Sequence, residues 1–161
     1  MFKKNRALNR RHCFVFLLWL ACLTSCQSTK QFPSANLAEA GWTTRQGQAV
    51  WRSRKDAPEI SGELLVATHT DGRSFVQFTK TPLPFVVAQT GTNFWQVQFV
   101  PNNKTYSGHG NPPLRIIWLH LPRCLLGAAP PKPYSWQRLE NHRWRLENRS
   151  SGEALEGYLL P

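Results

Sequence analysis

The stretch NFWQVQFV, residues 93–100, carries the strongest structural pattern of the chain. Trp95, Val97 and Phe99 fall on one face of an extended backbone, and two glutamines fall on the other. Such alternation is typical of a β-strand that buries one face. A strand of this kind needs neighbours, so we expect it to lie in an antiparallel sheet with one apolar face and one solvent-exposed face.

Other short strands, separated by turn residues, surround this stretch. Asp71-Gly72 suits the positive φ angles of a tight hairpin, and Thr90-Gly91-Thr92 supplies another turn. We predict strands at residues 63–70, 73–79, 84–89, 93–100, 143–148 and 154–160. The expected fold class is therefore mainly β: a curled antiparallel sheet composed of two meanders.

The segment 112–127 lies between the two meanders and is strongly apolar, so we expect it to cover the apolar face of the sheet. Pro122 suits the first turn of a helix and Gly127 suits its C-terminal cap, which predicts a short covering helix near residues 122–126. Residues 116–119 fit a helix or a buried strand, and their periodicity does not decide between them. Cys124 is interpreted as a small buried hydrophobe rather than a nucleophile.

The N-terminal region has the order of a secretory signal. Residues 1–12 are basic and contain no acid, and residues 13–23 are apolar. This apolar run is shorter than the roughly 20 residues of a membrane-spanning helix, although an uncleaved anchor helix is the alternative. Leu23-Thr24-Ser25-Cys26 resembles the lipobox of bacterial lipoproteins. The resemblance implies a signal peptide over residues 1–25, with diacylglycerol and an acyl chain such as palmitate on Cys26.

The same resemblance predicts the organisation and location of the mature chain. Residues 26–40 are polar and small, which favours a flexible tether, and residues 41–161 suffice for a single β-rich domain. Gln27, rather than Asp, follows the cysteine. In proteobacteria this implies sorting to the outer membrane, on the side that faces the periplasm.

Charge and composition narrow the classes of partner. Five of the 20 Lys and Arg residues precede Cys26, and all 9 acids follow it, so the net charge after that point is +6. A basic exported domain favours anionic lipids, lipopolysaccharide or cell-wall polymers, although solubility alone explains the charge equally well. The export signal argues against nucleic acid. No CxxC or HxxxH spacing is present, so neither a metal nor a cofactor is expected.

Four features of residues 60–160 together resemble the LolA/LolB lipoprotein-carrier superfamily. They are the turn Pro82-Leu83-Pro84, the strand around Trp95, the proline-led segment that ends at Leu126-Gly127, and the close of the chain from Trp144 to Gly157. The resemblance implies an open half-barrel with a helical lid over an apolar cavity for acyl chains. In membrane-anchored members, a leucine on a protruding turn helps to deliver lipoproteins into the membrane, and Leu83 matches that position.

The first functional hypothesis is therefore a membrane-anchored lipoprotein that binds acyl chains or handles lipoproteins. The aromatic and aliphatic residues of the predicted sheet and cover are the expected cavity lining. They are Phe78, Val86, Trp95, Val97, Phe99, Trp118, Leu125 and Trp144. The alternative for these side chains is an ordinary closed core, because protein interiors pack tightly.

Two other classes of function are weighed against it. A non-enzymatic interaction lipoprotein would bind phosphates of envelope polymers through Arg138, Arg143, Arg145 and Arg149, although these residues also fit a solvated strand face. An enzyme is not expected, because the acids are scattered and neither a G-x-S-x-G turn nor a glycine-rich phosphate loop is present. The histidines after Cys26 are likewise dispersed, at His69, His109, His120 and His142.

Overall fold

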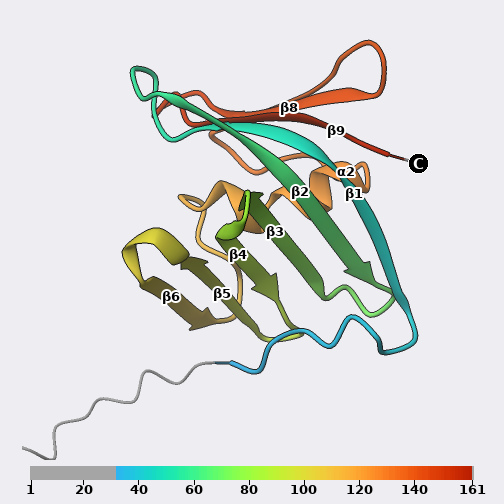
Figure 1. The fold of residues 1–161 in the computed structure, drawn as a ribbon. Coiled ribbons are helices and arrows are strands. Elements are labelled where there is room, and N and C mark those ends of the chain that lie inside the picture. The colour runs from blue at the N-terminus through green and yellow to red at the C-terminus, as the bar shows by residue number, and fades with distance from the viewer. Residues whose placement is uncertain (1–31, 161) are drawn as a thin grey trace, which may run out of the picture. The chain divides into compact units, whose positions relative to one another are not determined.

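The computed structural model describes residues 32–160, in which nine antiparallel strands form one sheet in the order β6-β5-β4-β3-β2-β1-β9-β8-β7 (Figure 1). The strands are β1 (Trp42–Arg52), β2 (Glu59–His69), β3 (Ser74–Lys80), β4 (Leu83–Thr90), β5 (Phe94–Phe99), β6 (Lys104–His109), β7 (Tyr134–Arg138), β8 (Arg143–Asn148) and β9 (Ala154–Leu159). The edge strands β6 and β7 do not pair, so the sheet is curled and unclosed. The prediction of a mainly β fold is confirmed. The expected signal peptide and Cys26 lie outside the described residues.

Strands with strong local patterns lie where the sequence predicted them. Val97 is buried at the centre of β5, and Trp95 and Phe99 pack against the core from the same strand. Gly72 adopts a φ of +93° between β2 and β3, the left-handed conformation that the predicted hairpin requires. The strands β2 to β5 therefore follow from local alternation and from the residues at their turns.

β1 was not predicted as a strand, and it changes the architecture. It pairs with β2 over its full length, from Trp42↔His69 to Arg52↔Glu59, and with β9 from Gly47↔Leu159 onward. The two expected meanders are therefore two parts of a single sheet. The edge strands β6 and β7 were not predicted either.

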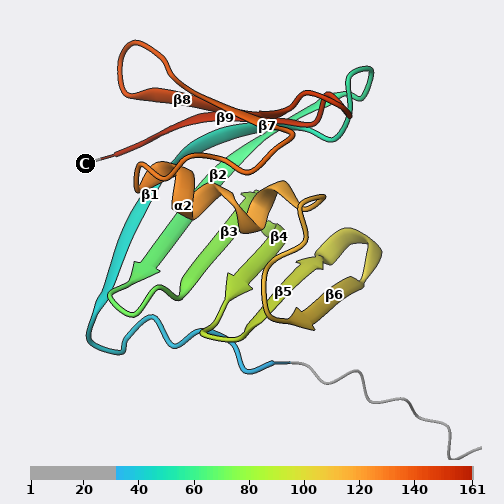
Figure 2. The ribbon, with the colours of Figure 1, turned by 180° about the vertical axis from the view of Figure 1, so that it is seen from behind.

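The segment between β6 and β7 covers the concave side of the sheet, as expected (Figure 2). It contains the 3₁₀ helix η2 (Ile117–Leu119) and the helix α2 (Leu121–Leu125), one residue from the predicted position; another 3₁₀ turn, η1 (Val100–Asn102), follows β5. The Trp118 indole is 0% exposed, and its ring centroid lies 5.3 Å from that of Phe78 and 5.6 Å from that of Trp51. Trp118 is thus the centre of the core.

A row of small residues crosses the neighbouring strands β2, β1 and β9. Ala49 pairs with Gly62 on one side and with Gly157 on the other. A Cβ atom at Gly62 would lie 2.4 Å from the Thr79 carbonyl oxygen, and one at Gly157 would lie 2.3 Å from that of Gln48. Only glycine permits these approaches, so the row allows the sheet to curl.

The residues that lead into β1 are held against the sheet. The Gln89 side-chain amide donates to the carbonyl of Pro33 (3.1 Å), and the Arg73 guanidinium pairs with the Glu39 carboxylate (3.0 Å). Two residues of the predicted tether, Pro33 and Glu39, thus contact the body of the domain, and the flexible tether over residues 26–40 stays a prediction. Short polar residues gave no local sign of these contacts, because both partners come later in the chain, from β4 and from the turn before β3.

Candidate functional site

The eight expected cavity residues all belong to one apolar cluster. Trp95, Phe99 and Leu125 are half-buried at its margin, and Trp144 is buried. The other four are 0% exposed: Phe78, Val86, Val97 and Trp118. A side chain with no exposed surface adjoins no space as large as a water molecule. The interior between the Trp95 strand and the Trp118 segment is therefore filled in this structure, and it holds no room for an acyl chain.

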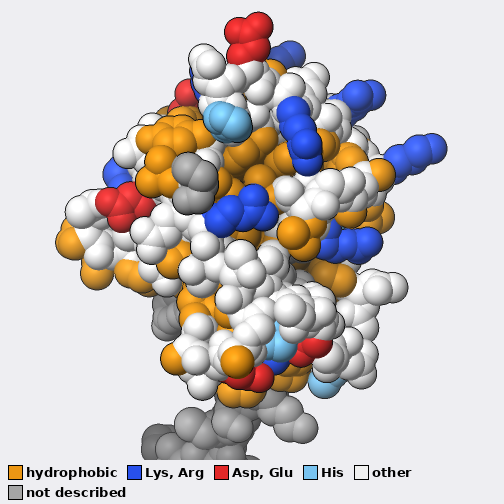
Figure 3. All heavy atoms as spheres, turned by 90° about the vertical axis from the view of Figure 1, so that its right-hand side faces the viewer, with side chains coloured by type: hydrophobic (Ala, Val, Ile, Leu, Met, Phe, Trp, Pro, Cys, Tyr) orange, Lys and Arg blue, Asp and Glu red, His pale blue; other side chains and the backbone are white. Residues whose placement is uncertain are grey.

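Two of the expected residues, Leu125 and Trp144, line an open groove instead. This groove, of about 490 Å³, lies at one mouth of the concave face, between α2 and the β7–β9 strands. Its other apolar lining residues are Trp136, Leu139, Leu159 and Leu160. Figure 3 shows the side of the molecule that carries the C-terminal end of β9, with hydrophobic side chains beside Lys and Arg side chains. The groove thus has an apolar floor next to cations.

The floor is built by neighbouring strands and the end of a helix. Trp136 of β7 pairs with Leu146, and Trp144 lies diagonally across from it on β8. Their rings stack, with centroids 5.8 Å apart and planes 16° apart. Leu125, the last residue of α2, lines one side of the groove. The next residue, Leu126, lines a separate hollow. Residues on neighbouring strands thus place two aromatic rings in one stacked pair.

The arginines near this surface differ in their partners. Arg143 forms an ion pair with Glu156, and Arg145 lies between Glu147 (3.0 Å) and Glu156 (3.2 Å). Arg138, in contrast, forms no ion pair with residues 32–160. The predicted basic face is therefore divided: Arg143 and Arg145 are paired with carboxylates, and Arg138, which pairs with Trp144, lies on the opposite face of the sheet.

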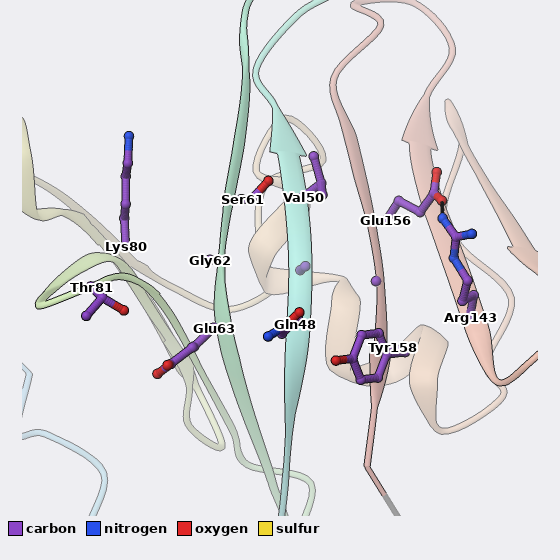
Figure 4. Close-up of a pocket in the computed structure, with 12 residues that line it drawn as sticks. Gln48, Val50, Ser61, Gly62, Glu63, Lys80, Thr81, Arg143, Glu156 and Tyr158 are labelled. Atoms are coloured by element: carbon purple, nitrogen blue, oxygen red, sulfur yellow. Dashed lines mark hydrogen bonds and ion pairs between the residues drawn. The ribbon is translucent and has the colours of Figure 1, made fainter.

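A larger hollow, of about 690 Å³, lies on the outer side of the sheet (Figure 4). Gln48, Ser61 and Tyr158 line it from β1, β2 and β9, and Arg143 and Glu156 meet at its margin. Its charges are of both signs, and small residues such as Gly62 and Gly157 lie between longer polar ones.

Leu83 is the first residue of β4, directly after the turn that joins β3 to β4, and it is 67% exposed. In this antiparallel sheet the turn between β3 and β4 lies at the opposite end of the strands from Gln89, which holds Pro33 (Figure 1). The exposure fits a residue that contacts another surface. Its membrane-insertion role stays a prediction.

Two of the titratable residues singled out from the sequence, Cys124 and His120, are buried. Cys124 is 1% exposed, as expected, and burial raises the pKa of its thiol to about 11. His120 is buried, with Nε2 3.2 Å from the Pro113 carbonyl oxygen, and burial lowers its pKa. Within residues 32–160, no three His, Cys, Asp or Glu side chains are placed to bind a metal ion, and no helix has the length and apolarity to cross a bilayer.

Sequence reasoning missed five groove residues: Arg45, Trp136, Leu139, Leu159 and Leu160. Arg45 and Leu159 lie on paired strands, β1 and β9, that are distant in the sequence. Trp136 carried a usable signal, because the pattern Tyr134-Ser135-Trp136 alternates, but the strand is only five residues long. The groove is thus assembled by long-range pairing.

A scan against protein-family models and a search of curated proteins found no match to this chain.

Proposed function

We propose that this protein is a lipid-anchored protein of the bacterial envelope that binds acyl chains in the groove beside α2. The observation that carries the proposal is the apolar floor formed by Leu125 and the stacked rings of Trp136 and Trp144. This floor is apolar, concave and open to solvent. A groove of about 490 Å³ also falls within the ~300–1,000 Å³ of small-molecule sites.

Burial supplies the binding energy in this proposal. Apolar surface removed from water contributes about 25 cal/mol per Å². Indole rings and a leucine present such surface, so a methylene chain is the natural occupant, although the Nε1 atoms of Trp136 and Trp144 are buried without a hydrogen-bond partner among the described residues. We propose that, in the cell, the protein handles the acyl chains of lipoproteins at the outer membrane.

The same proposal includes a specific type of curled sheet. We assign the curled sheet to an open half-barrel of the LolA/LolB kind, in which the η2–α2 segment serves as the cover. The position of this segment on the concave side supports the assignment. The filled interior around Trp118 departs from the cavity expected for that superfamily, so the bound chain is placed at the mouth of the half-barrel.

Mass spectrometry of the detergent-extracted protein tests the envelope anchor. We expect a chain that begins at Cys26 and carries diacylglycerol and a further acyl chain. An unmodified Cys26, or a chain that retains residues 1–25, would contradict the anchor.

Acyl-chain binding is tested with two adjacent leucines. Titration with the neutral ligand 1-monopalmitoylglycerol, followed by tryptophan fluorescence, should show saturable binding. Leu125→Gln places an amide against the chain, which costs about 1–3 kcal/mol and should weaken binding about tenfold or more. Leu126→Gln is the matched control, because Leu126 is 62% exposed and lines another hollow. Equal effects of the two changes, or no binding, would refute the groove.

A further inference from the structure

The groove contains a cation on the concave face of the sheet. Arg45 of β1 pairs with Val66 of β2, whose side chain is 4% exposed in the core. Paired residues of an antiparallel sheet point to the same face, so the half-buried Arg45 side chain points to the core face. It lines the groove together with Leu125 and Leu159.

No carboxylate of the described chain satisfies this cation. Arg45 forms no ion pair or side-chain hydrogen bond with residues 32–160, whereas Arg143, on the same groove, has Glu156. The residues that line the groove include no Asp or Glu, but they include Arg138 and His142 in addition. Among the described residues, the groove therefore has a positive side without a carboxylate partner for Arg45, next to its apolar floor.

From this arrangement we infer that the groove selects single-chain anionic amphiphiles, with the headgroup on Arg45 and the chain on the Trp136 and Trp144 rings. The inference rests on the acyl-chain binding proposed above and specifies the class of ligand. A half-buried guanidinium gains a charge-assisted bond from a carboxylate or phosphate, and its fork matches either group in two parallel hydrogen bonds. The ligand that fits this groove therefore has an anionic headgroup for Arg45 and an apolar chain for the floor.

The test compares ligands that share a chain and differ in charge. Palmitate, hexadecyl phosphate, 1-monopalmitoylglycerol and inorganic phosphate are titrated into the mature chain from residue 26 with Cys26→Ser, which removes the lipid and the need for detergent. We expect the two anionic amphiphiles to bind about 10- to 100-fold more tightly than the neutral glyceride, the range that one charge-assisted pair supplies. Inorganic phosphate should bind far more weakly than hexadecyl phosphate.

Arg45→Met keeps the length of the side chain and removes its charge. It should lower the affinity for palmitate and hexadecyl phosphate to that of the glyceride and leave glyceride binding unchanged. Arg123→Met is the control, because Arg123 is exposed on α2 and lines the separate hollow that contains Leu126. Both variants are checked for an unchanged thermal midpoint, and Arg45→Lys, which keeps the charge, should retain part of the preference.

Each outcome of this experiment has a defined meaning. If anionic and neutral ligands bind equally well, or if Arg45→Met keeps the preference for anions, the inference is wrong while acyl-chain binding stands. If inorganic phosphate binds as tightly as hexadecyl phosphate, the groove is a simple anion site and the inference is again wrong. If no ligand with a chain binds, both the inference and the proposed function are refuted.

Discussion

Glu153 precedes β9 and is half-buried. The indole Nε1 of Trp51 donates a hydrogen bond to its Oε1 atom at 3.1 Å. Burial raises the pKa of this carboxyl from 4.5 to about 7, and the Trp51 hydrogen bond opposes that rise only in part. The folded protein therefore holds a proton on Glu153 at pH values where the unfolded chain has released it.

Stability should consequently fall as the pH rises. Between pH 4.5 and 7 the folded state binds more protons than the unfolded state, so each step up in pH favours unfolding. We expect the free energy of unfolding from urea titrations to decrease by at most about 3 kcal/mol from pH 4.5 to 8. Glu153→Gln should remove most of this slope, whereas Glu140→Gln, at an exposed turn, should keep it. An unchanged slope in the Glu153 variant would contradict this account.

At the scale of elements, the strand row Gly62–Ala49–Gly157 determines where the sheet curls. Gly62→Ala would bring a Cβ atom to 2.4 Å from the Thr79 carbonyl oxygen and 3.0 Å from the Phe78 ring. We expect a loss of about 1–3 kcal/mol, the usual cost of overpacking, measured by thermal or urea unfolding. Ser61→Ala, one residue earlier and exposed on the other face, should cost much less. Equal losses would mean that the row does not control the curl.

The elements also show what the sequence could predict. The hairpin at Asp71-Gly72, the strand around Trp95 and the helix near Pro122 depend on local alternation, turn residues and caps, and all three lie as predicted. β1 could not be found in this way, because its polar first half has no alternation and its partners β2 and β9 fix its conformation.

The candidate site was less predictable for the same reason. Leu125 and Trp144 were chosen as apolar residues of the sheet and its cover, and they do line a groove. Arg45 joins them only because β1 pairs with β9 near the C-terminal end of the chain. Sequence patterns could not tell that Trp118 fills the interior, since a tryptophan that lines a cavity and one that packs a core look alike.

For the whole molecule, the positions of Pro33 and Leu83 predict an orientation on the membrane. Cys26 precedes Pro33 by seven residues, which span at most about 25 Å when extended. Pro33 is held at one end of the strands, and the Leu83 turn lies at the other. If Cys26 carries the proposed lipid, we therefore expect the Leu83 turn to point away from the bilayer that holds it.

A polarity-sensitive fluorophore on Leu83→Cys, in the lipidated protein on liposomes, measures this orientation. Its emission should report water, as should that of a probe on the exposed Ser61→Cys. Emission typical of the bilayer interior at position 83 alone would instead support the membrane-insertion role.

We propose that the acyl chain lies in the groove between α2 and the β7–β9 strands, outside the filled core. Paramagnetic broadening of backbone amide signals by a stearate with a nitroxide near its methyl end measures this position directly. We predict that broadening centres on Leu125, Trp136 and Leu159 and spares Phe78, Val86 and Val97. Broadening centred on the latter three residues, or spread evenly over the surface, would contradict the account.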